Sequence, residues 1–278
     1  MHIIQAIILG IVQGLTEFIP VSSSGHLLFI EKLFGWDTTN VAFDIAVHWG
    51  TLLALLWYFR KDWMDILTSF ARRVVLRRPY GKATDASASG RYVIPIVVAS
   101  IPAAMVGIAF DSNIEAMRDR VWMLPGLAAA LVVVGLVMLL AERVGKKQRE
   151  MAAMNYVDYV TIGIAQAVAL FPGVSRSGIT ISAGLFRGLD RAAAARFSFL
   201  LSTPVIFGAG LKALWDLHKD GIPAGDALIF AVGFLAAAIS GYLAIRFLMN
   251  YLQRGSLKPF AIYRFILAAA ILVVFFRL

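Results

Sequence analysis

The sequence predicts an all-α, polytopic membrane protein with six transmembrane helices and two re-entrant helix-turn-helix segments. The first observation is composition: of 278 residues, 60% are hydrophobic and 15% are charged. A soluble domain has about 45–50% apolar and about 25% charged residues. The second observation is a mean hydropathy of +0.78, and the third is a series of long stretches with almost no charge. Together they indicate a chain that lies largely within a lipid bilayer.

The charge balance and the cysteine count exclude other classes of protein. The formal net charge is +9, but most of the cations lie in loops between apolar stretches. There they indicate membrane orientation, and we expect no nucleic-acid partner. The chain contains no cysteine, which excludes disulfide bonds and metal sites built from thiolates.

Six stretches are long enough to cross a bilayer, which requires roughly 20 apolar residues. They lie at about 41–59, 92–110, 121–141, 197–215, 227–245 and 260–276. All six are expected to be helices, because lipid offers the backbone no other hydrogen-bond partner.

Loop charges predict which side of the membrane each loop occupies. Segment 60–91 carries eight Lys/Arg against three Asp, and segment 142–150 carries four against two Glu. Further cations precede the fourth span and separate the fifth from the sixth. By the positive-inside rule these regions are cytoplasmic, and the more acidic loops 111–120 and 216–226 are external. Six spans then put the N- and C-termini outside.

Two further apolar segments, about 2–34 and 155–190, are each interrupted in the middle by Pro, Ser and Gly. If either segment crossed the bilayer completely, the loop assignment would fail. We therefore predict that both are re-entrant, the first entering from outside and the second from the cytoplasm. Such backbone is tolerated within the membrane only where protein or a wet cavity satisfies its polar groups.

The two interrupted segments are also related in sequence. At a constant offset of 153 residues they share eight identities without a gap. The pairs are Gly10 with Gly163, Ile11 with Ile164, Gln13 with Gln166, Phe18 with Phe171, Val21 with Val174, Ser22 with Ser175, Ser24 with Ser177, and Gly25 with Gly178. Residues 1–150 and 151–278 are thus predicted to form an inverted-topology repeat within one membrane domain. The functional site of such a repeat is expected near the membrane midplane, where the interrupted segments meet.

At the tip of each re-entrant segment a helix is expected to begin near Ser24 or Ser177. A helix start presents unpaired N–H groups and a partial positive charge, which favour an anion such as phosphate. Arg176 adds a forked, permanently charged donor. The alternatives are close helix packing for the Ser/Gly clusters and snorkelling to the cytoplasmic surface for Arg176. The hydroxyl donors of the two tips are Ser22, Ser23, Ser24, Ser175 and Ser177.

Glu17 precedes the first tip by one turn, and Gln13 lies four residues earlier on the same helical face. A carboxylate within the membrane needs a partner: Arg176, a divalent metal or a proton. Its alternative role is an ion pair with Arg176 that only holds the repeats together. His26 follows the serines and is placed to serve as general acid, base or nucleophile, or as a packing residue.

Other polar residues in the spans carry weaker hypotheses. Asp44 and His48 lie four residues apart and could form a pair or part of a metal site. Lys212 is expected to snorkel to the external surface. Arg264 lies close to the cytoplasmic end of the last span.

Two motifs resemble the signature regions of a known family. "QGLTEFIPVSSSGH" (Gln13–His26) and "PGVSRSGIT" (Pro172–Thr180) resemble those of the undecaprenyl-diphosphate phosphatases of the bacitracin-resistance type. The resemblance extends over nearly the whole chain, including "GTLLALLWYF" (Gly50–Phe59) and "PFAIYRF" (Pro259–Phe265). Gln13 occupies a position where some members of the family have Glu.

The resemblance implies a bacterial inner-membrane enzyme of cell-wall synthesis that confers bacitracin resistance. Its substrate is a C55 polyprenyl diphosphate, hydrolysed to the monophosphate and inorganic phosphate. A divalent cation, Mg²⁺ or Ca²⁺, assists, and the active site opens to the outer face. The resemblance assigns the central catalytic roles to Glu17, Ser23, His26 and Arg176, with Glu17 as the metal ligand. The predicted substrate-binding residues are Gln13, Ser22, Ser24, Gly25, Gly173, Ser175, Ser177 and Thr180.

The main alternative is a transporter or flippase of polyprenyl phosphate lipids, because paired re-entrant segments in an inverted repeat are typical of transporters. The sequence leaves three candidates for the nucleophile: Ser23, His26 and an activated water. From side-chain chemistry alone we expect His26→Ala to be more damaging than Ser23→Ala, because serine without a base is a poor nucleophile. Whether the protein forms a homodimer stays open.

Overall fold

The computed structural model describes residues 1–36, 41–75, 77, 86–118, 123–220 and 227–277. These residues form eleven α-helices and two short 3₁₀ helices, with no β-strand element in the described ranges. The predicted all-α fold class is therefore confirmed. In the first half the helices are α1 (Ile3–Phe18), α2 (Ser23–Phe34), α3 (Val41–Tyr58), α4 (Arg60–Val75), η1 (Ala86–Tyr92), α5 (Val93–Arg118) and α6 (Met123–Val144). In the second half they are η2 (Met151–Ala153), α7 (Tyr156–Val168), α8 (Arg176–Phe186), α9 (Arg191–Asp220), α10 (Ala227–Tyr251) and α11 (Lys258–Phe275).

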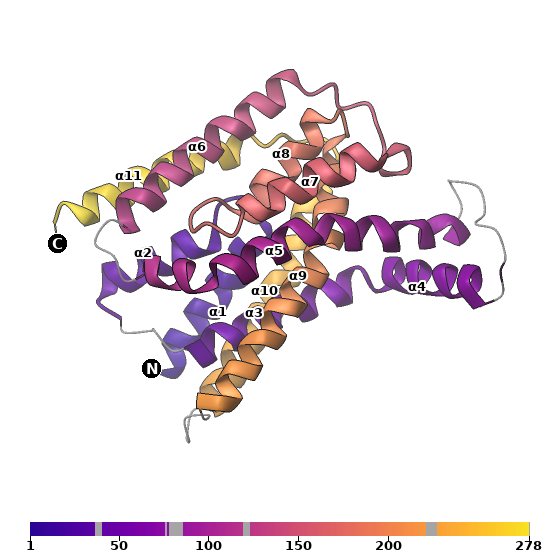
Figure 1. Ribbon diagram of the computed structural model, residues 1–278. Coiled ribbons are helices and arrows are strands. Elements are labelled where there is room, and N and C mark those ends of the chain that lie inside the picture. Colours follow the sequence, from indigo (N-terminus) through magenta and orange to yellow (C-terminus); the bar gives the residue numbers. More distant parts are fainter. Residues whose placement is uncertain (37–40, 76, 78–85, 119–122, 221–226, 278) are drawn as a thin grey trace.

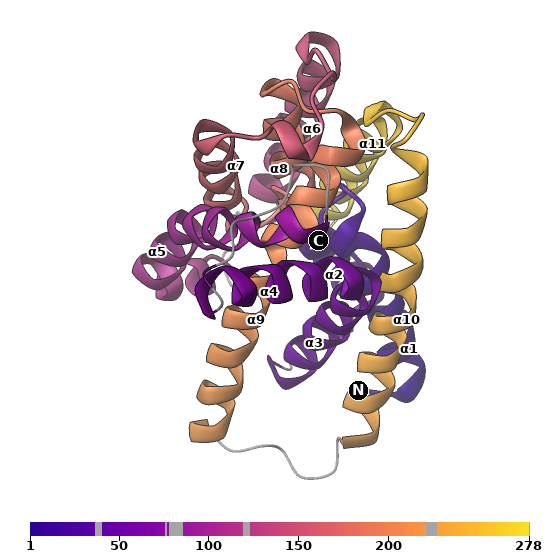
Figure 2. The same ribbon diagram turned by 90° about the vertical axis from the view of Figure 1, so that its right-hand side faces the viewer.

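Five helices are long and apolar enough to cross a membrane: α5, α6, α9, α10 and α11. The sixth predicted span corresponds to α3. This helix is long and apolar enough to cross a membrane only when it is counted together with α4, and the two helices meet at a bend of 71°. The protein is thus a multi-pass membrane protein. Figure 2 shows α9 and α10 running through most of the height of the molecule.

Two of the segments that connect predicted spans contain helix. Residues 60–75 form helix α4 rather than a basic loop, because Ile66 and Ser69 on one face are buried and pack the helix against the protein. Residues 111–118 continue helix α5. The external assignment depended on six acidic side chains, none of which is described. For Asp111, Glu115, Asp216 and Asp220 only the helical backbone is described, and Asp119 and Asp226 lie outside the described residues.

Small residues bring the first segment close to α10. A Cβ atom at Gly14 would collide with Ser240 and with the Ala237 carbonyl oxygen, and a Cβ at Gly50 would collide with the Phe234 carbonyl oxygen. Glycine therefore lets α1 and α3 pack directly on the backbone of α10, as is common between membrane helices.

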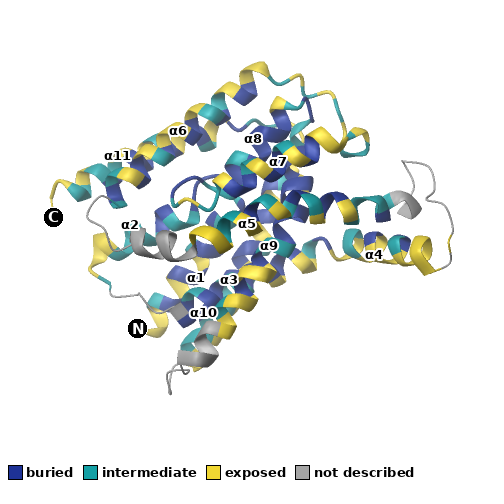
Figure 3. Ribbon diagram, in the orientation of Figure 1, coloured by how far each residue is buried: buried dark blue, intermediate teal, exposed yellow. Residues whose placement is uncertain are grey.

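Many large apolar side chains are exposed on the helices, and Figure 3 marks the exposed positions in yellow. On α5, for example, Ile108 is 82% exposed and Met105 is 65% exposed. A soluble protein rarely exposes apolar surface on this scale, whereas lipid solvates it. Figure 1 also places both chain termini at one side of the molecule, with α4 at the opposite side.

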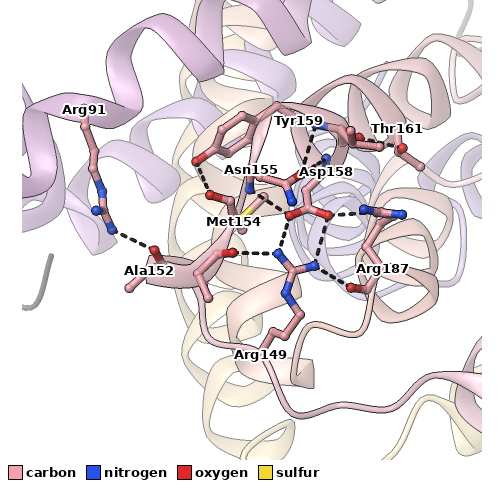
Figure 4. Close-up of polar contacts among 11 residues, drawn as sticks. Arg91, Arg149, Ala152, Met154, Asn155, Asp158, Tyr159, Thr161 and Arg187 are labelled. Carbon is pink, nitrogen blue, oxygen red and sulfur yellow. Dashed lines mark hydrogen bonds and ion pairs between the residues drawn. The ribbon is translucent and has the colours of Figure 1, made fainter.

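Near the start of α7, the carboxylate of Asp158 is fully buried and is shared by two arginines. Arg149 donates from both terminal nitrogens, at 3.1 and 2.7 Å, and Arg187 donates from Nε at 2.8 Å. The backbone N–H of Asn155 donates to the same carboxylate at 2.8 Å. Figure 4 shows these side chains converging on Asp158. The network ties the loop before α7 to the end of α8.

A second carboxylate connects the ends of three spans. Glu142 on α6 accepts from the Nε and Nη2 atoms of Arg191 at 2.8 and 2.7 Å and from the backbone N–H of Leu257 at 2.8 Å. Arg191 begins α9 and Leu257 precedes α11. Some of the cations that the sequence analysis used to orient the loops therefore also hold helix ends together.

Candidate active site

Both segments that were predicted to be re-entrant form helix-turn-helix units, α1–α2 and α7–α8, with closely similar turns. Helices α2 and α8 begin at Ser23 and Arg176, one residue earlier than predicted, so the capping residues are Ser22 and Ser175. Ser22 has φ 77° and ψ 102°, and Ser175 has φ 69° and ψ 109°. Each hydroxyl accepts a hydrogen bond at 3.3 Å from the amide three residues later. Ser22 and Ser175, predicted as substrate ligands, therefore serve as helix caps.

The two tips lie against each other. The Gly173 amide of the second turn donates to Ser24 Oγ of the first at 3.2 Å. Arg176 Nη2, at the start of α8, donates to Glu17 Oε1 at the end of α1 at 2.7 Å. Residues about 150 positions apart thus form one polar cluster, and the predicted meeting of the two tips is observed.

Glu17 is the centre of the polar cluster. Besides the ion pair with Arg176 through Oε1, its Oε2 atom accepts from Ser23 Oγ at 2.9 Å and from Gln13 Nε2 at 3.0 Å. The side chains of Glu17 and Arg176 are only 10% and 12% exposed. Desolvation strengthens such hydrogen-bonded ion pairs when their geometry is good. The result is a continuous chain from the Ser23 hydroxyl through Glu17 to the Arg176 guanidinium.

Two buried polar atoms in this cluster have no hydrogen-bond partner among the described residues: Arg176 Nη1 and Gln13 Oε1. Buried polar groups in proteins nearly always have partners, and an unsatisfied one costs about 1–3 kcal/mol. Arg176 Nη1 offers a charged donor, and Gln13 Oε1 offers an acceptor. Both atoms are available to a polar ligand.

The helix starts add backbone donors. Near the start of each helix, backbone amides donate to the capping serine. These are the amides of Gly25 and His26 on α2 and of Gly178 and Ile179 on α8. The preceding amides, those of Ser23 and Ser24 on α2 and of Arg176 and Ser177 on α8, have no acceptor within the described part of the chain. Free N–H groups at two helix starts, next to a buried arginine, are a favourable setting for phosphate.

His26 is held at both ring nitrogens. Nδ1 lies 2.7 Å from the Ser22 carbonyl oxygen, and Nε2 lies 2.7 Å from the hydroxyl of Tyr263 on α11. A carbonyl only accepts, so Nδ1 carries the proton, and in the neutral ring Nε2 accepts from the Tyr263 hydroxyl. His26 can attack or take a proton only by giving up its bond to Tyr263.

The remaining predicted ligands lie behind the tips. Thr180 is fully buried; its hydroxyl donates to the Arg176 carbonyl oxygen at 2.7 Å and lies 2.6 Å from Ser198 Oγ on α9. Ser177 Oγ is 3.4 Å from Ser175 Oγ. The structure therefore places Thr180 and Ser177 where they support the start of α8.

Sequence reasoning missed two residues of α11. Tyr263 bonds to His26, and Arg264 is fully buried beside both turns. Both lie in "PFAIYRF", a stretch noted for the family resemblance, and Arg264 was named only as a polar residue near the end of the last span. The available signal was Arg264 itself, because a charge inside an apolar membrane helix is functional by default.

Few side chains near the tips are suited to hold a metal. Within the described residues no group of three or more His, Cys, Asp or Glu side chains gathers. The Nδ1 atom of His48 lies 2.7 Å from the backbone carbonyl oxygen of Asp44. This ring nitrogen therefore does not form the side-chain pair with Asp44 that the spacing suggested. Near the tips, the protein oxygens suited to a hard cation are the Glu17 carboxylate and the unpartnered Gln13 Oε1. Mg²⁺ commonly takes one or two such protein ligands and completes its shell with substrate phosphates and water.

Comparisons with known proteins show the family of this chain. The family model for bacitracin resistance protein BacA matches residues 6–270. The undecaprenyl-diphosphatase of Rubrobacter xylanophilus is 44% identical over 273 residues, which cover 98% of this chain and 97% of the relative. That of Thermodesulfovibrio yellowstonii is 45% identical over 278 residues, covering 99% of this chain and 98% of the relative. That of Caldicellulosiruptor bescii is 43% identical over 268 residues, covering 96% of both. With a family model matched along nearly its whole length and relatives at this identity, the chain belongs to the family of bacitracin resistance protein BacA.

Proposed function

We propose that the chain hydrolyses undecaprenyl diphosphate to undecaprenyl phosphate and inorganic phosphate, and so recycles the lipid carrier of peptidoglycan synthesis. The relatives named undecaprenyl-diphosphatase support this substrate. One structural observation carries the proposal: Glu17 bridges the Ser23 hydroxyl and the Arg176 guanidinium, and Arg176 keeps one buried nitrogen without a partner. This arrangement provides a nucleophile with a base and an anion site beside it.

The diphosphate binds with its terminal phosphate between the two helix starts. Arg176 Nη1 and the free amides of Ser23, Ser24 and Ser177 donate to its oxygens. Charge on the phosphoryl oxygens grows or spreads in the transition state, and preorganised donors in a desolvated site stabilise it most. The apolar outer surfaces of the helices leave the polyprenyl tail in lipid.

Ser23 is the nucleophile that the geometry favours. Its hydroxyl is partly exposed and points to Glu17 Oε2 at 2.9 Å, which is hydrogen-bonding distance to a base. Oγ attacks the terminal phosphorus as its proton passes to Glu17. The bond from that phosphorus to the bridging oxygen breaks, and the departing undecaprenyl phosphate takes the proton from Glu17.

Water then attacks the phosphoserine. Glu17, again a carboxylate, takes a proton from the water and returns it to Ser23 Oγ as inorganic phosphate leaves. His26 holds the first turn through the Ser22 carbonyl and contacts Tyr263. Its role is to position the first tip, which carries Ser23. Side-chain chemistry alone suggested that His26→Ala would be the more damaging substitution; the geometry favours Ser23 as the nucleophile instead.

We also propose that a divalent cation, Mg²⁺ or Ca²⁺, takes part. Glu17 and Gln13 Oε1 would hold it together with substrate oxygens. When bound, the cation supplies charge neutralisation at the diphosphate. Chelation should abolish turnover, and readdition of Mg²⁺ or Ca²⁺ should restore it.

The protein is proposed to lie in the plasma membrane of a bacterium, in the inverted-topology arrangement of residues 1–150 and 151–278, with the active site open to the outer side and both termini outside. Because the chain has no cysteine, single cysteines are unique labels. His2→Cys should react with a membrane-impermeant maleimide from outside, and Gln148→Cys only from the cytoplasm. The reverse pattern would contradict the orientation.

Phosphate release from the purified protein in detergent tests the function itself. Hydrolysis needs no second compartment, so the wild-type chain should release one phosphate per undecaprenyl diphosphate. The Glu17→Gln variant should release it about a hundredfold more slowly. Ser100→Ala on α5, whose hydroxyl bonds, among the described residues, only to the Ile96 carbonyl oxygen of its own helix, should behave as wild type. Lipid transport in vesicles without phosphate release would favour the transporter alternative.

A further inference from the structure

Arg264 is the largest fully buried side chain of the described structure, with 0% exposure. It lies two turns into α11 and forms no ion pair with an acid among the described residues. A buried charge without a counter-ion is costly unless other groups satisfy it. Its surroundings must therefore provide that compensation.

Backbone carbonyl oxygens provide it. Arg264 Nη1 lies 3.5 Å from the Pro20 carbonyl oxygen of the first turn. Nη2 lies 2.8 and 3.1 Å from the carbonyl oxygens of Gly173 and Val174 in the second turn. Nε and Nη2 also reach the carbonyl oxygens of Leu131 and Ala130 on α6, at 3.1 and 3.3 Å.

The contacts are symmetric with respect to the repeat. Pro20 and Gly173 occupy equivalent positions, 153 residues apart, so one guanidinium holds the same carbonyl of both turns. The neighbouring residue, Tyr263, holds His26 of the first tip. Two consecutive residues of α11 therefore restrain the tips, although α11 belongs to neither re-entrant segment.

We infer that Arg264 is a positioning residue of the active site: it fixes the distance between the two turns so that Ser23 and Glu17 on the first face Arg176 on the second. It does not bind substrate, because its donors are directed to five carbonyl oxygens. Arg176, in contrast, keeps one buried nitrogen unpartnered. The inference rests on the proposed function, since its readout is hydrolysis.

Lysine is the informative substitution. Arg264→Lys keeps the positive charge but replaces a planar fork by a single nitrogen, which cannot span carbonyls on both turns and on α6. We expect kcat to fall by at least about tenfold while KM changes by less than about threefold, because the lost interaction orients catalytic groups rather than holding substrate. Arg264→Gln provides a second variant without charge. The matched control is Arg277→Lys, the same substitution at an exposed arginine just beyond the C-terminal end of the same helix.

A second measurement reports the geometry directly. Spin labels at Leu15→Cys on α1 and Phe171→Cys in the second turn, both exposed positions, should give a narrow distance distribution in the otherwise wild-type chain. Arg264→Lys should broaden it, and Arg277→Lys should not.

The outcomes separate this inference from the proposed function. If wild type and Arg277→Lys release no phosphate, the proposed function fails. If both release phosphate and Arg264→Lys keeps wild-type kcat and an unchanged distance distribution, only the positioning role is overturned. A loss confined to KM would also overturn it, by making Arg264 a substrate ligand.

Discussion

In the first re-entrant segment the His2 amide donates to Gln5 Oε1 at 2.7 Å, and 153 residues later the Asn155 amide donates to Asp158 Oδ2 at 2.8 Å. The helices α1 and α7 thus begin in the same way. At the tips, Ser22 and Ser175 cap α2 and α8 with almost the same backbone angles. The two segments therefore share a backbone framework from the start of their first helix to the cap of their second.

Their side chains differ where the chemistry lies. Glu17 in the first segment corresponds to Leu170 in the second, Ser23 corresponds to Arg176, and His26 corresponds to Ile179. The first tip therefore holds the acid, the hydroxyl and the imidazole, and the second holds the cation. Neither tip is a site alone, because Glu17 finds its charged partner only across the interface.

The N-termini of the first helices of the two segments, α1 and α7, differ as well. The Gln5 side chain that caps α1 is neutral, whereas Asp158 caps α7 and is also bound by Arg149 and Arg187. In the proposed mechanism, one helix-turn-helix framework carries catalysis at one tip and phosphate binding at the other. Charged anchoring is present only at the start of α7. The following substitutions test that division.

Ser23→Ala should have the largest effect, a loss of at least about a thousandfold in kcat, because it removes the nucleophile. A phosphoserine should be trappable at Ser23 in the wild type by acid quench with radiolabelled substrate. The stability control is Ser100→Ala. Measurable turnover by Ser23→Ala together with a dead His26→Ala would reverse the assignment within the first tip.

Glu17→Gln should lower kcat by about a hundredfold, the scale of a lost general base. The amide keeps the shape and can accept from Ser23, but it removes the negative charge that accepts the proton and pairs with Arg176. The complementary change Leu170→Glu, at the equivalent position, should not restore turnover in the double variant if the tips have fixed roles. Recovery in that variant would show that the tips are interchangeable.

Arg176→Lys should reduce kcat/KM by at least about tenfold, roughly 1.4 kcal/mol, because lysine cannot bond to Glu17 and to phosphate through one planar fork. Steady-state phosphate release measures this. Near-normal activity would give Arg176 a purely structural role and remove the anion site from the second tip.

Asp158→Asn should leave turnover nearly unchanged but destabilise the protein. The change leaves Arg149 and Arg187 without their carboxylate, and we expect a cost of about 2 kcal/mol after allowing for the partial exposure of both arginines. Thermal unfolding in detergent measures it, with Gln5→Ala as the counterpart at the start of α1. Equal losses for the two variants would contradict the special anchoring of the second segment.

The smallest effect should come from the caps. Ser22→Ala and Ser175→Ala each lose a capping hydroxyl, at about 1 kcal/mol, and the loss should be equal because the two turns match. Glycine at either position should cost less than alanine, because it adopts the positive φ more readily. Unfolding midpoints of the four variants check this, and a clear difference between tips would show that the frameworks are not equivalent.

The sequence by itself determined the class of fold, and it predicted two interrupted helical segments and the residues grouped at their tips. Apolar stretches can cross lipid only as helices, and the repeated "SSSG" and "SRSG" motifs mark the two helix starts through capping chemistry that is local in the chain. The grouping of Gln13, Glu17, Ser23 and Arg176 followed from the repeat. Local rules were sufficient to predict a feature wherever the interacting residues lie within a few positions of each other in the sequence.

Only the tertiary structure decided which groups face each other. Ser22 and Ser175 are caps because α2 and α8 begin one residue early, and the ring nitrogens of His26 are occupied because α11 places Tyr263 beside it. Helix α4 formed from a basic stretch because one of its faces is buried. Arg264 lies far along the chain from both turns, and no local pattern states that its donors reach carbonyl oxygens at positions 20 and 173. Such contacts depend on packing between distant segments, which sequence periodicity does not encode.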